Sequence, residues 1–382
     1  MEKINIWELG KYVYIIPNDS FLTYINSSIR DKFRSKEKFY SLIKGEIKLP
    51  YSSFRNLLKY SYYKKYYAPL DVFLICCYNL NITTEYLQRS IISYKTKKGY
   101  NVINNPLLPI RLTPIFDMVI AHTMADGCVV GYKERQPYLR YRQYDKELRD
   151  LYFKKIESLF GKIDYKKDEY FERNYVAICP PVLSQLFIDY YGLNKRSFLS
   201  DRARVPPALF NKPKINQLAF LLAFIIDEAK IDSTLIDIRL KNVNLTEDLY
   251  KICKRLGYSS TFVKKGDYGF LYIKRDGMKK LFRDYQNLIK KYPQAYFGKL
   301  HKKIEDGFKI YNRPIYKSKG NSDLILNYLK IEDLTVNQLA NKVNMTRQGV
   351  RFHVHNLENG GKIMKKGMYK RNFLYSVGGR RC

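Results

Sequence analysis

Two apolar helix patterns that each end in a carboxylate constrain this chain most strongly. Residues 119–127 read Val-Ile-Ala-His-Thr-Met-Ala-Asp-Gly, and residues 221–229 read Leu-Leu-Ala-Phe-Ile-Ile-Asp-Glu-Ala. Asp126 and Glu228 hold the same place in the two runs, 102 residues apart. Each run has an alanine at its third position, where a neighbouring helix can approach closely. We therefore predict that the two helices pack together and bring their terminal acids side by side.

Similar elements follow the two runs in the same order. After each run come strand, helix, strand and helix patterns, and a glycine ends the central helix pattern at Gly161 in the first case and Gly257 in the second. A repeated order of this kind indicates an internal duplication. We predict a mixed α+β core over residues 113–312, with halves at 113–211 and 212–312.

With these residues and this spacing, the sequence resembles the LAGLIDADG homing endonuclease family in its single-chain, two-motif form. The resemblance implies a duplicated αββαββα core whose strands form a saddle over double-stranded DNA. It implies that Asp126 and Glu228 hold Mg²⁺ or Mn²⁺ for phosphodiester cleavage, and that Lys274 stabilises the charge of the transition state. The implied DNA-facing residues of the strands are Arg140, Arg142 and Arg239.

The second run departs from the family pattern at three positions and the first run at one. Met124 and Ile226 stand at the usually acidic sixth position. Asp227 stands where that family has a small residue, and Ala229 stands in place of the closing glycine. An alanine there is costly if the backbone must adopt a positive φ, so we expect Glu228 to be the less well placed acid. His122, inside the first run, is expected to be a packed interface histidine and not a metal ligand.

Residues 1–94 predict a helical DNA-binding domain. Helix patterns at 21–33 and 35–45, a third from Tyr51, and the stretch 69–87 together resemble the phage-repressor-like helix-turn-helix. The alternative is a small helical domain with a basic solvated face. Residues 95–112, with two prolines, a glycine and no lasting period, are predicted to be a linker. The expected DNA-facing residues are Tyr51, Ser52, Ser53, Arg55 and Lys59.

Residues 320–382, after a predicted linker at 313–319, resemble a winged helix-turn-helix. The pattern contains a helix at 335–344, a recognition helix at 346–358 and a basic hairpin after Gly360 and Gly361. Winged helices also mediate protein contacts, and the basic hairpin favours DNA here. The expected recognition residues are Thr346, Arg347, Gln348 and Arg351, and the expected wing residues are Lys365, Lys366, Lys370 and Arg371.

The composition agrees with a nucleic-acid partner. The formal net charge is +33, which attracts a polyanion. Six cysteines with no C-x-x-C pair are typical of small core residues in a reducing cytosol. We find no signal-peptide core, no apolar run of membrane-spanning length, no glycine-rich phosphate loop and no zinc-finger spacing. We expect a cytoplasmic, nucleoid-associated protein, a monomer, with no membrane contact and no small-molecule cofactor.

Two functional classes remain open. The first is a site-specific, metal-dependent DNA endonuclease of the homing type. The second is a DNA binder that does not cut, either a transcription regulator or a replication-origin binder. Its precedent is the WhiA family of regulators, which joins a LAGLIDADG-like domain to a helix-turn-helix. The paired acids favour cleavage, whereas the two additional DNA-reading modules and the missing second glycine favour regulation.

Overall fold

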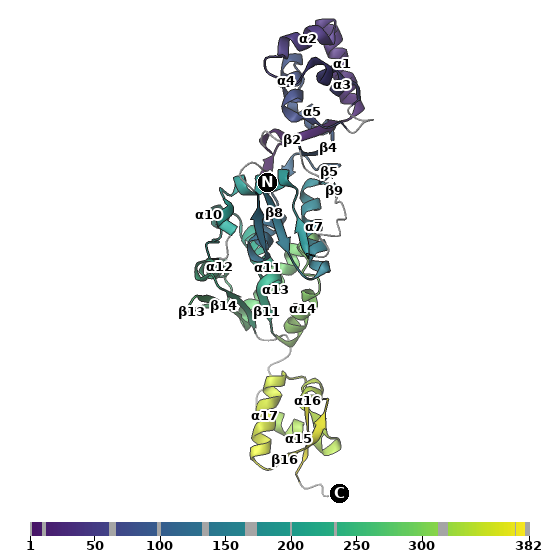
Figure 1. Ribbon diagram of the computed structural model, residues 1–382. Coiled ribbons are helices and arrows are strands. Elements are labelled where there is room, and N and C mark those ends of the chain that lie inside the picture. The colour runs from purple at the N-terminus through teal and green to yellow at the C-terminus, as the bar shows by residue number, and fades with distance from the viewer. Residues whose placement is uncertain are drawn as a thin grey trace. The chain divides into compact units, whose positions relative to one another are not determined.

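The chain has mixed α+β structure with small antiparallel sheets (Figure 1). The computed structural model describes residues 2–9, 13–60, 66–97, 101–131, 137–164, 174–198, 201–232, 235–311, 320–370 and 372–378. The chain divides into two compact units, Met1–His301 and Lys302–Cys382. The predicted linker at 313–319 lies outside the described residues. In the described segments, no helix has both the length and the apolar character that a membrane span requires.

Helices dominate the N-terminal region, and they bury the apolar positions that predicted them. Phe21, Ile25 and Ile29 are all buried along one side of the first helix. Ser35 caps the second helix as predicted, because its Oγ accepts a hydrogen bond from the backbone N–H of Lys38 at 3.2 Å. The helices are α1 (Asp19–Phe33), α2 (Lys36–Ile43), α3 (Tyr51–Tyr60), α4 (Leu70–Leu80) and α5 (Thr84–Ser90).

The segment 95–112 contains strands, which corrects the prediction of an irregular linker. Within a five-stranded antiparallel sheet of order β3-β2-β4-β5-β9, β5 pairs with β4 and β9. Ile103 and Ile110 are fully buried, so burial and backbone pairing override the local proline and glycine signals. The strands are β2 (Val13–Pro17), β3 (Ala68–Pro69), β4 (Ile91–Thr96), β5 (Val102–Asn104) and β9 (Lys162–Asp164), with β1 (Lys3–Ile4) paired to β6 (Ile110–Arg111).

The first motif run lies in a helix that leads directly into a three-stranded sheet of order β10-β8-β7. The next helix, α7, ends just before Gly161, where the sequence predicts. It stops at Gly161, whose φ of 113° and close approach to the backbone oxygen of Asn105 leave no room for a side chain. The elements are α6 (Pro114–Asp126), β7 (Gly127–Val130), β8 (Tyr138–Arg142), α7 (Lys146–Phe160), β10 (Val176–Ile178) and α9 (Pro181–Tyr190).

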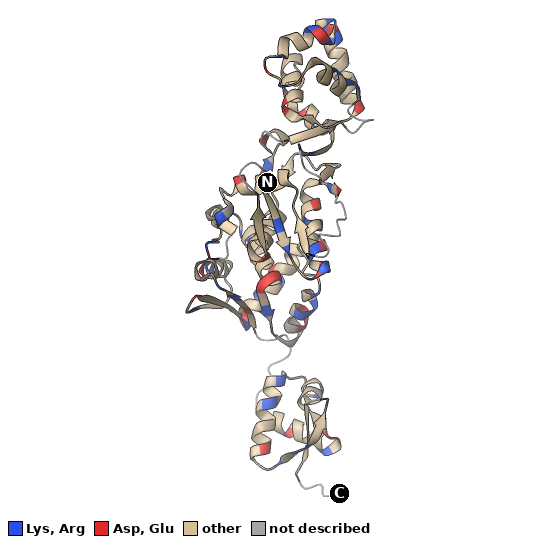
Figure 2. Cartoon of the chain, viewed as in Figure 1, with Lys and Arg blue, Asp and Glu red and all other residues tan. Residues whose placement is uncertain are grey.

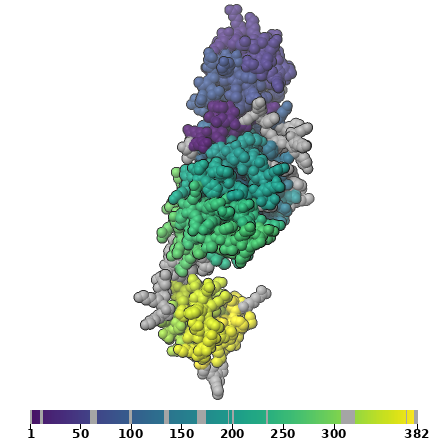
Figure 3. Space-filling view, turned by 90° about the vertical axis from the view of Figure 1, so that its left-hand side faces the viewer, coloured from purple at the N-terminus to yellow at the C-terminus, as the bar shows by residue number. Residues whose placement is uncertain are grey.

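The second motif run likewise lies in a helix followed by a four-stranded sheet of order β11-β12-β14-β13. This region, teal to green, occupies much of the face turned to the viewer in Figure 3. Strand β11 and helix α14 were not predicted. The elements are α10 (Pro207–Asn211), α11 (Lys214–Glu228), β11 (Ala229–Ile231), β12 (Leu235–Leu240), α12 (Val243–Leu256), β13 (Ser260–Lys265), β14 (Tyr268–Lys274), α13 (Arg275–Lys291) and α14 (Leu300–Tyr311), with short 3₁₀ helices at Ile6–Leu9, Lys195–Phe198 and Pro293–Ala295.

The motif helices α6 and α11 pack together, and a buried polar cluster joins their N-terminal ends. Asp117, in the first turn of α6, accepts hydrogen bonds from Lys212 Nζ and from Asn216 Nδ2, each at 2.6 Å. The Tyr191 hydroxyl donates to the same carboxylate. Lys212 Nζ also lies 4.6 Å from the ring centroid of Tyr190. These contacts fix where the two helices begin relative to each other.

Cysteine placement matches most of its prediction. Cys76, Cys77, Cys179 and Cys253 are buried with free thiols, as expected for small core residues. Cys128 is exposed instead, because it occupies an outward position of the short strand β7.

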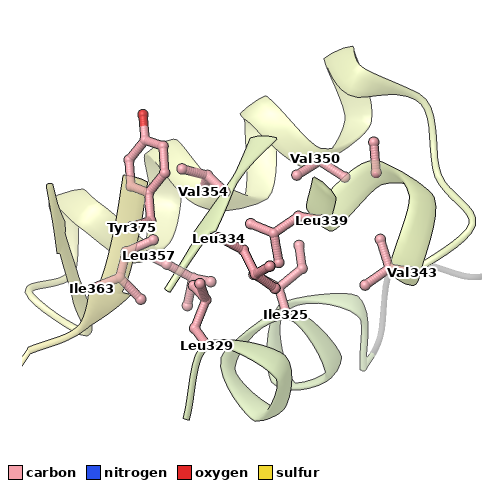
Figure 4. Close-up of a cluster of buried hydrophobic side chains, with 11 residues drawn as sticks. Ile325, Leu329, Leu334, Leu339, Val343, Val350, Val354, Leu357, Ile363 and Tyr375 are labelled. Atoms are coloured by element: carbon pink, nitrogen blue, oxygen red, sulfur yellow. The ribbon is translucent and has the colours of Figure 1, made fainter. Parts of the chain in front are cut away.

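The second unit folds around its own apolar core (Figure 4). Helix α16 begins with a capping box, in which Thr335 and Gln338 satisfy each other's backbone N–H groups. Strand β17 lies between β15 and β16. The elements are α15 (Asn321–Ile331), β15 (Leu334–Thr335), α16 (Val336–Lys342), α17 (Arg347–Asn359), β16 (Ile363–Tyr369) and β17 (Asn372–Val377).

Candidate active site and nucleic-acid interface

The two motif acids end packed helices, and their charges interact. Asp126 is the last residue of α6, and Glu228 is the last residue of α11. Burial and, to a smaller degree, the charge of Asp227 together raise the pKa of Asp126 to about 7. Burial, followed by the charges of Asp126 and Asp227, raises the pKa of Glu228 to about 7 as well. Both ionised carboxylates are therefore held at a cost that a bound cation would relieve.

The chemistry of this pair fits a hard divalent cation. Mg²⁺ prefers oxygen ligands, and it usually keeps several waters while taking only one or two carboxylates from the protein. Among the described residues, no group of three or more His, Cys, Asp or Glu side chains is placed to hold a metal. A cation here would thus be held by Asp126 and Glu228, and water and phosphate oxygens would supply its remaining ligands.

Asp227 is a buried neighbour of the two acids, and the sequence pattern did not reveal its partners. Its side chain has no exposed surface, and it forms hydrogen bonds to the Tyr141 hydroxyl at 2.7 Å and to His122 Nδ1 at 2.8 Å. The charge of Lys155, which is 1% exposed, partly offsets the burial that raises the pKa of Asp227 to about 8. An acid inside an apolar run is costly to bury without partners. The position of Asp227 in such a run could therefore have predicted that it has buried hydrogen-bond partners.

This buried network connects the two halves of the site. Tyr141 lies in β8 and stacks on Tyr152 of α7, with ring centroids 4.6 Å apart. Two residues after Tyr141, Gln143 donates a hydrogen bond from Nε2 to Asp126 Oδ2 at 3.0 Å. Asp227 from α11 therefore holds the strand that leads to the partner of Asp126. His122 is an interface residue, as predicted.

The closing glycine of the first run is required by space and not by a positive φ. Gly127 has φ −132°, and a Cβ at this position would lie 2.5 Å from the backbone oxygen of Arg140. Ala229 has φ −89° and ψ 140°, an ordinary extended conformation. The predicted backbone cost at Ala229 is therefore wrong, and Glu228 is not displaced by it.

The sheet register does not place Lys274 beside the acids. Ala229 pairs with Ile238, which in turn pairs with Leu271 of β14. Lys274 lies three residues further along β14, about 10 Å away at ordinary strand spacing, and two strands away from β11. Its assigned role at the transition state has no support from this geometry.

The three arginines predicted to face DNA from the strands differ in their burial and in their hydrogen-bond partners. Leu139 and Tyr141 of β8 are buried, which leaves Arg140 and Arg142 on the other side of the strand, as the alternation predicts. Arg140 Nε is buried and has no hydrogen-bond partner in the described part of the chain. Arg239 is exposed, but Asp237 accepts hydrogen bonds from its Nε at 2.8 Å and its Nη2 at 2.5 Å.

The predicted residues of α3 lie away from its buried side. Phe54, Leu57 and Leu58 face the core, and Ser52, Arg55 and Lys59 are exposed. Burial lowers the pKa of Lys36, and the nearby charges of Arg55, Lys59 and Arg30 lower it further, so these four cations form one cluster. Arg30 and Lys36 extend the predicted set. Tyr51 is half-buried and packs on Tyr40, with ring centroids 5.3 Å apart, and Ser53 is also half-buried.

Of the four predicted recognition residues in the second unit, Arg347, Gln348 and Arg351 are exposed on α17. Thr346 is instead the N-cap of α17, because its hydroxyl accepts a hydrogen bond from the Gly349 backbone N–H at 3.0 Å.

The predicted wing lysines of the β16–β17 hairpin differ in their contacts. Lys365 pairs with Glu358 at 3.0 Å, and Lys366 pairs with Asp333 at 2.8 Å. Lys370 lies over the Tyr369 ring at 5.3 Å. Arg371 lies outside the described residues.

Figure 2 shows Lys and Arg in all parts of the chain, which agrees with a basic excess that no single tail explains. In comparisons with known proteins, the sequence matches no family model and no curated protein.

Proposed function

We propose that this chain is a sequence-specific, double-stranded DNA-binding protein that cleaves DNA with Mg²⁺ or Mn²⁺ at Asp126 and Glu228. Residues 113–312 would be a duplicated LAGLIDADG-like core. The supporting observation is that α6 and α11 pack together and end in two partly buried carboxylates whose charges repel each other. In structural ion pairs, groups of opposite charge lie side by side. Two neighbouring acids at matching helix ends instead favour a cation site.

The two acids and the residues near them have defined tasks in this proposal. Asp126 and Glu228 would hold the cation, which activates water and neutralises charge on the phosphate. Gln143 orients Asp126 through its hydrogen bond. Arg140 and Arg142 would position the duplex by its phosphates.

The terminal regions would extend the DNA contact. We propose a helix-turn-helix built on α2 and α3, with the cation cluster of Arg30, Lys36, Arg55 and Lys59 on the phosphates. We propose a winged helix-turn-helix in the second unit, with α17 in the major groove. The protein would act as a cytoplasmic, nucleoid-associated monomer.

Arg347→Ala is expected to weaken binding to a specific duplex about 5- to 150-fold, the cost of removing a side chain that reads a base, and to weaken non-specific binding much less. Lys370→Ala is the matched control, because it removes a cation expected to bind phosphate and no base-reading side chain. It should lower the affinity for the specific and the non-specific duplex alike and reduce the salt slope by about one. The measurement is fluorescence anisotropy over a salt series, on a duplex first selected from a random library. Equal decreases in affinity from both variants on both duplexes would remove α17 from the recognition role.

The second candidate function is DNA binding without cleavage, in a transcription regulator or a replication-origin binder. The position of Lys274 away from the acids favours it, because the site then lacks that cation for the transition state. A genome-wide occupancy map separates the candidates. Occupancy at one insertion-like locus supports homing, whereas occupancy at promoters or at an origin supports regulation.

A further inference from the structure

One face of the four-stranded sheet carries a row of aromatic rings. Tyr268, Phe270 and Tyr272 alternate along β14 with the buried residues Leu271 and Ile273. Helices α12 and α13 pack against this sheet, and their buried apolar residues account for the side on which Leu271 and Ile273 lie. The three tyrosine and phenylalanine rings therefore share the other face, where Tyr268 is 48% exposed.

The rings are arranged for stacking. Phe270 and Tyr272 are 6.3 Å apart between centroids and only 20° from parallel. Because both rings are half-buried, each keeps surface available to a ligand while its edge is fixed by neighbouring side chains.

Cations on the neighbouring strands lie over one of these rings, that of Phe270. Arg239 of β12 pairs with Phe270 across the sheet, and its guanidinium lies 5.6 Å from the centroid of that ring. Lys265 of β13 lies 5.8 Å from the same centroid. Asp237 holds the Arg239 guanidinium in place through the two hydrogen bonds described above. The face thus combines flat apolar surfaces with two fixed cations, and Asp237 balances part of their charge.

We propose that this face binds single-stranded nucleic acid by stacking unpaired bases on Phe270 and Tyr272, with Arg239 and Lys265 on the phosphates. An accessible ring face can stack on the face of an unpaired base. A base in a duplex exposes only its edge in the grooves, so it cannot stack in this way. In the first sheet, strand β8 carries Arg140 and Arg142 on its outward side, which suits a phosphate backbone. The second sheet would therefore hold an unpaired strand, a ligand that the proposed duplex cleavage does not require.

The test uses the full chain and two fluorescent 15-mers, oligo-dT and oligo-rU, each with one 2-aminopurine that is quenched when it stacks. Phe270→Leu and Tyr272→Leu each remove a ring and keep an apolar strand residue. Each is expected to raise the dissociation constant about tenfold, since stacking contributes about 1–3 kcal/mol per base. The 2-aminopurine quenching disappears, and the salt slope is unchanged. Arg239→Gln should instead reduce the salt slope.

Tyr78→Leu is the control, because Tyr78 is 82% exposed on α4, far along the sequence from this sheet. Wild-type-like thermal unfolding confirms that each ring variant is folded. Unchanged strand affinity in both ring variants would overturn the proposal, and so would an equal decrease in duplex affinity, because the rings would then serve the duplex. Preference for oligo-dT or oligo-rU tells whether the strand is DNA or RNA. Failure of duplex binding in the wild type, with strand binding intact, would overturn the proposed function alone.

Discussion

At pH 8 and without metal, the variant Asp126→Asn, Glu228→Gln will be more stable than the wild type by about 7 kcal/mol. Both carboxyl groups have a pKa of about 7 in the folded chain, raised from 3.8 and 4.5. Between about pH 4 and pH 7 the folded state holds protons that the unfolded state has released. Stability of the wild type therefore falls as the pH rises through this window, and the neutral amides remove this pH dependence.

The measurement is chemical denaturation at pH 5 and pH 8. At pH 5 the difference in stability should be much smaller, about 2 kcal/mol, because the folded wild type still holds both protons and only the unfolded acids have largely ionised. Mg²⁺ at pH 8 should stabilise the wild type and leave the variant unchanged. A wild type that is as stable as the variant at pH 8 would show that the folded chain does not hold the two ionised acids at a cost.

Asp227→Leu will destabilise the folded chain by about 3 kcal/mol at pH 7. Asp227 is fully buried, and the substitution leaves the Tyr141 hydroxyl and His122 Nδ1 without their shared partner. Each buried polar group left unsatisfied costs about 1–3 kcal/mol. Urea denaturation followed by circular dichroism measures the decrease in stability.

Asp227→Asn is the matched control, since its amide oxygen still accepts from Tyr141, and it should cost about 1 kcal/mol. The triple variant Asp227→Leu, Tyr141→Phe, His122→Leu should recover much of the stability, because no polar group is then left without a partner. If Asp227→Leu is as stable as the wild type, the network does not stabilise the packing of α6 against α11.

Strong local signals predicted much of the secondary structure. The two motif helices, the helices that begin after Ser35 and Thr335, and the end of α7 at Gly161 follow from hydrophobic period and from capping chemistry. These features depend on residues within one or two turns of each other, and sequence reports such features well. The mixed α+β class follows from the same patterns.

Features set by distant contacts could not be predicted. Strand β5 forms because β4 and β9 supply its backbone partners, although its own sequence reads as a loop. The link from Asp227 to Tyr141 joins residues 86 positions apart. The distance of Lys274 from the acids follows from strand register, which the sequence does not show.

Cleavage of a tight-binding duplex by the wild type and by the Asp126→Asn, Glu228→Gln variant tests the central claim most directly. Both proteins are first shown to bind the selected duplex equally in Ca²⁺, and Mg²⁺ or Mn²⁺ is then added. We predict scission of both strands by the wild type and none by the variant. Intact DNA in the wild-type reaction, or equal cutting by both proteins, would contradict a metal-dependent active site at the paired ends of α6 and α11.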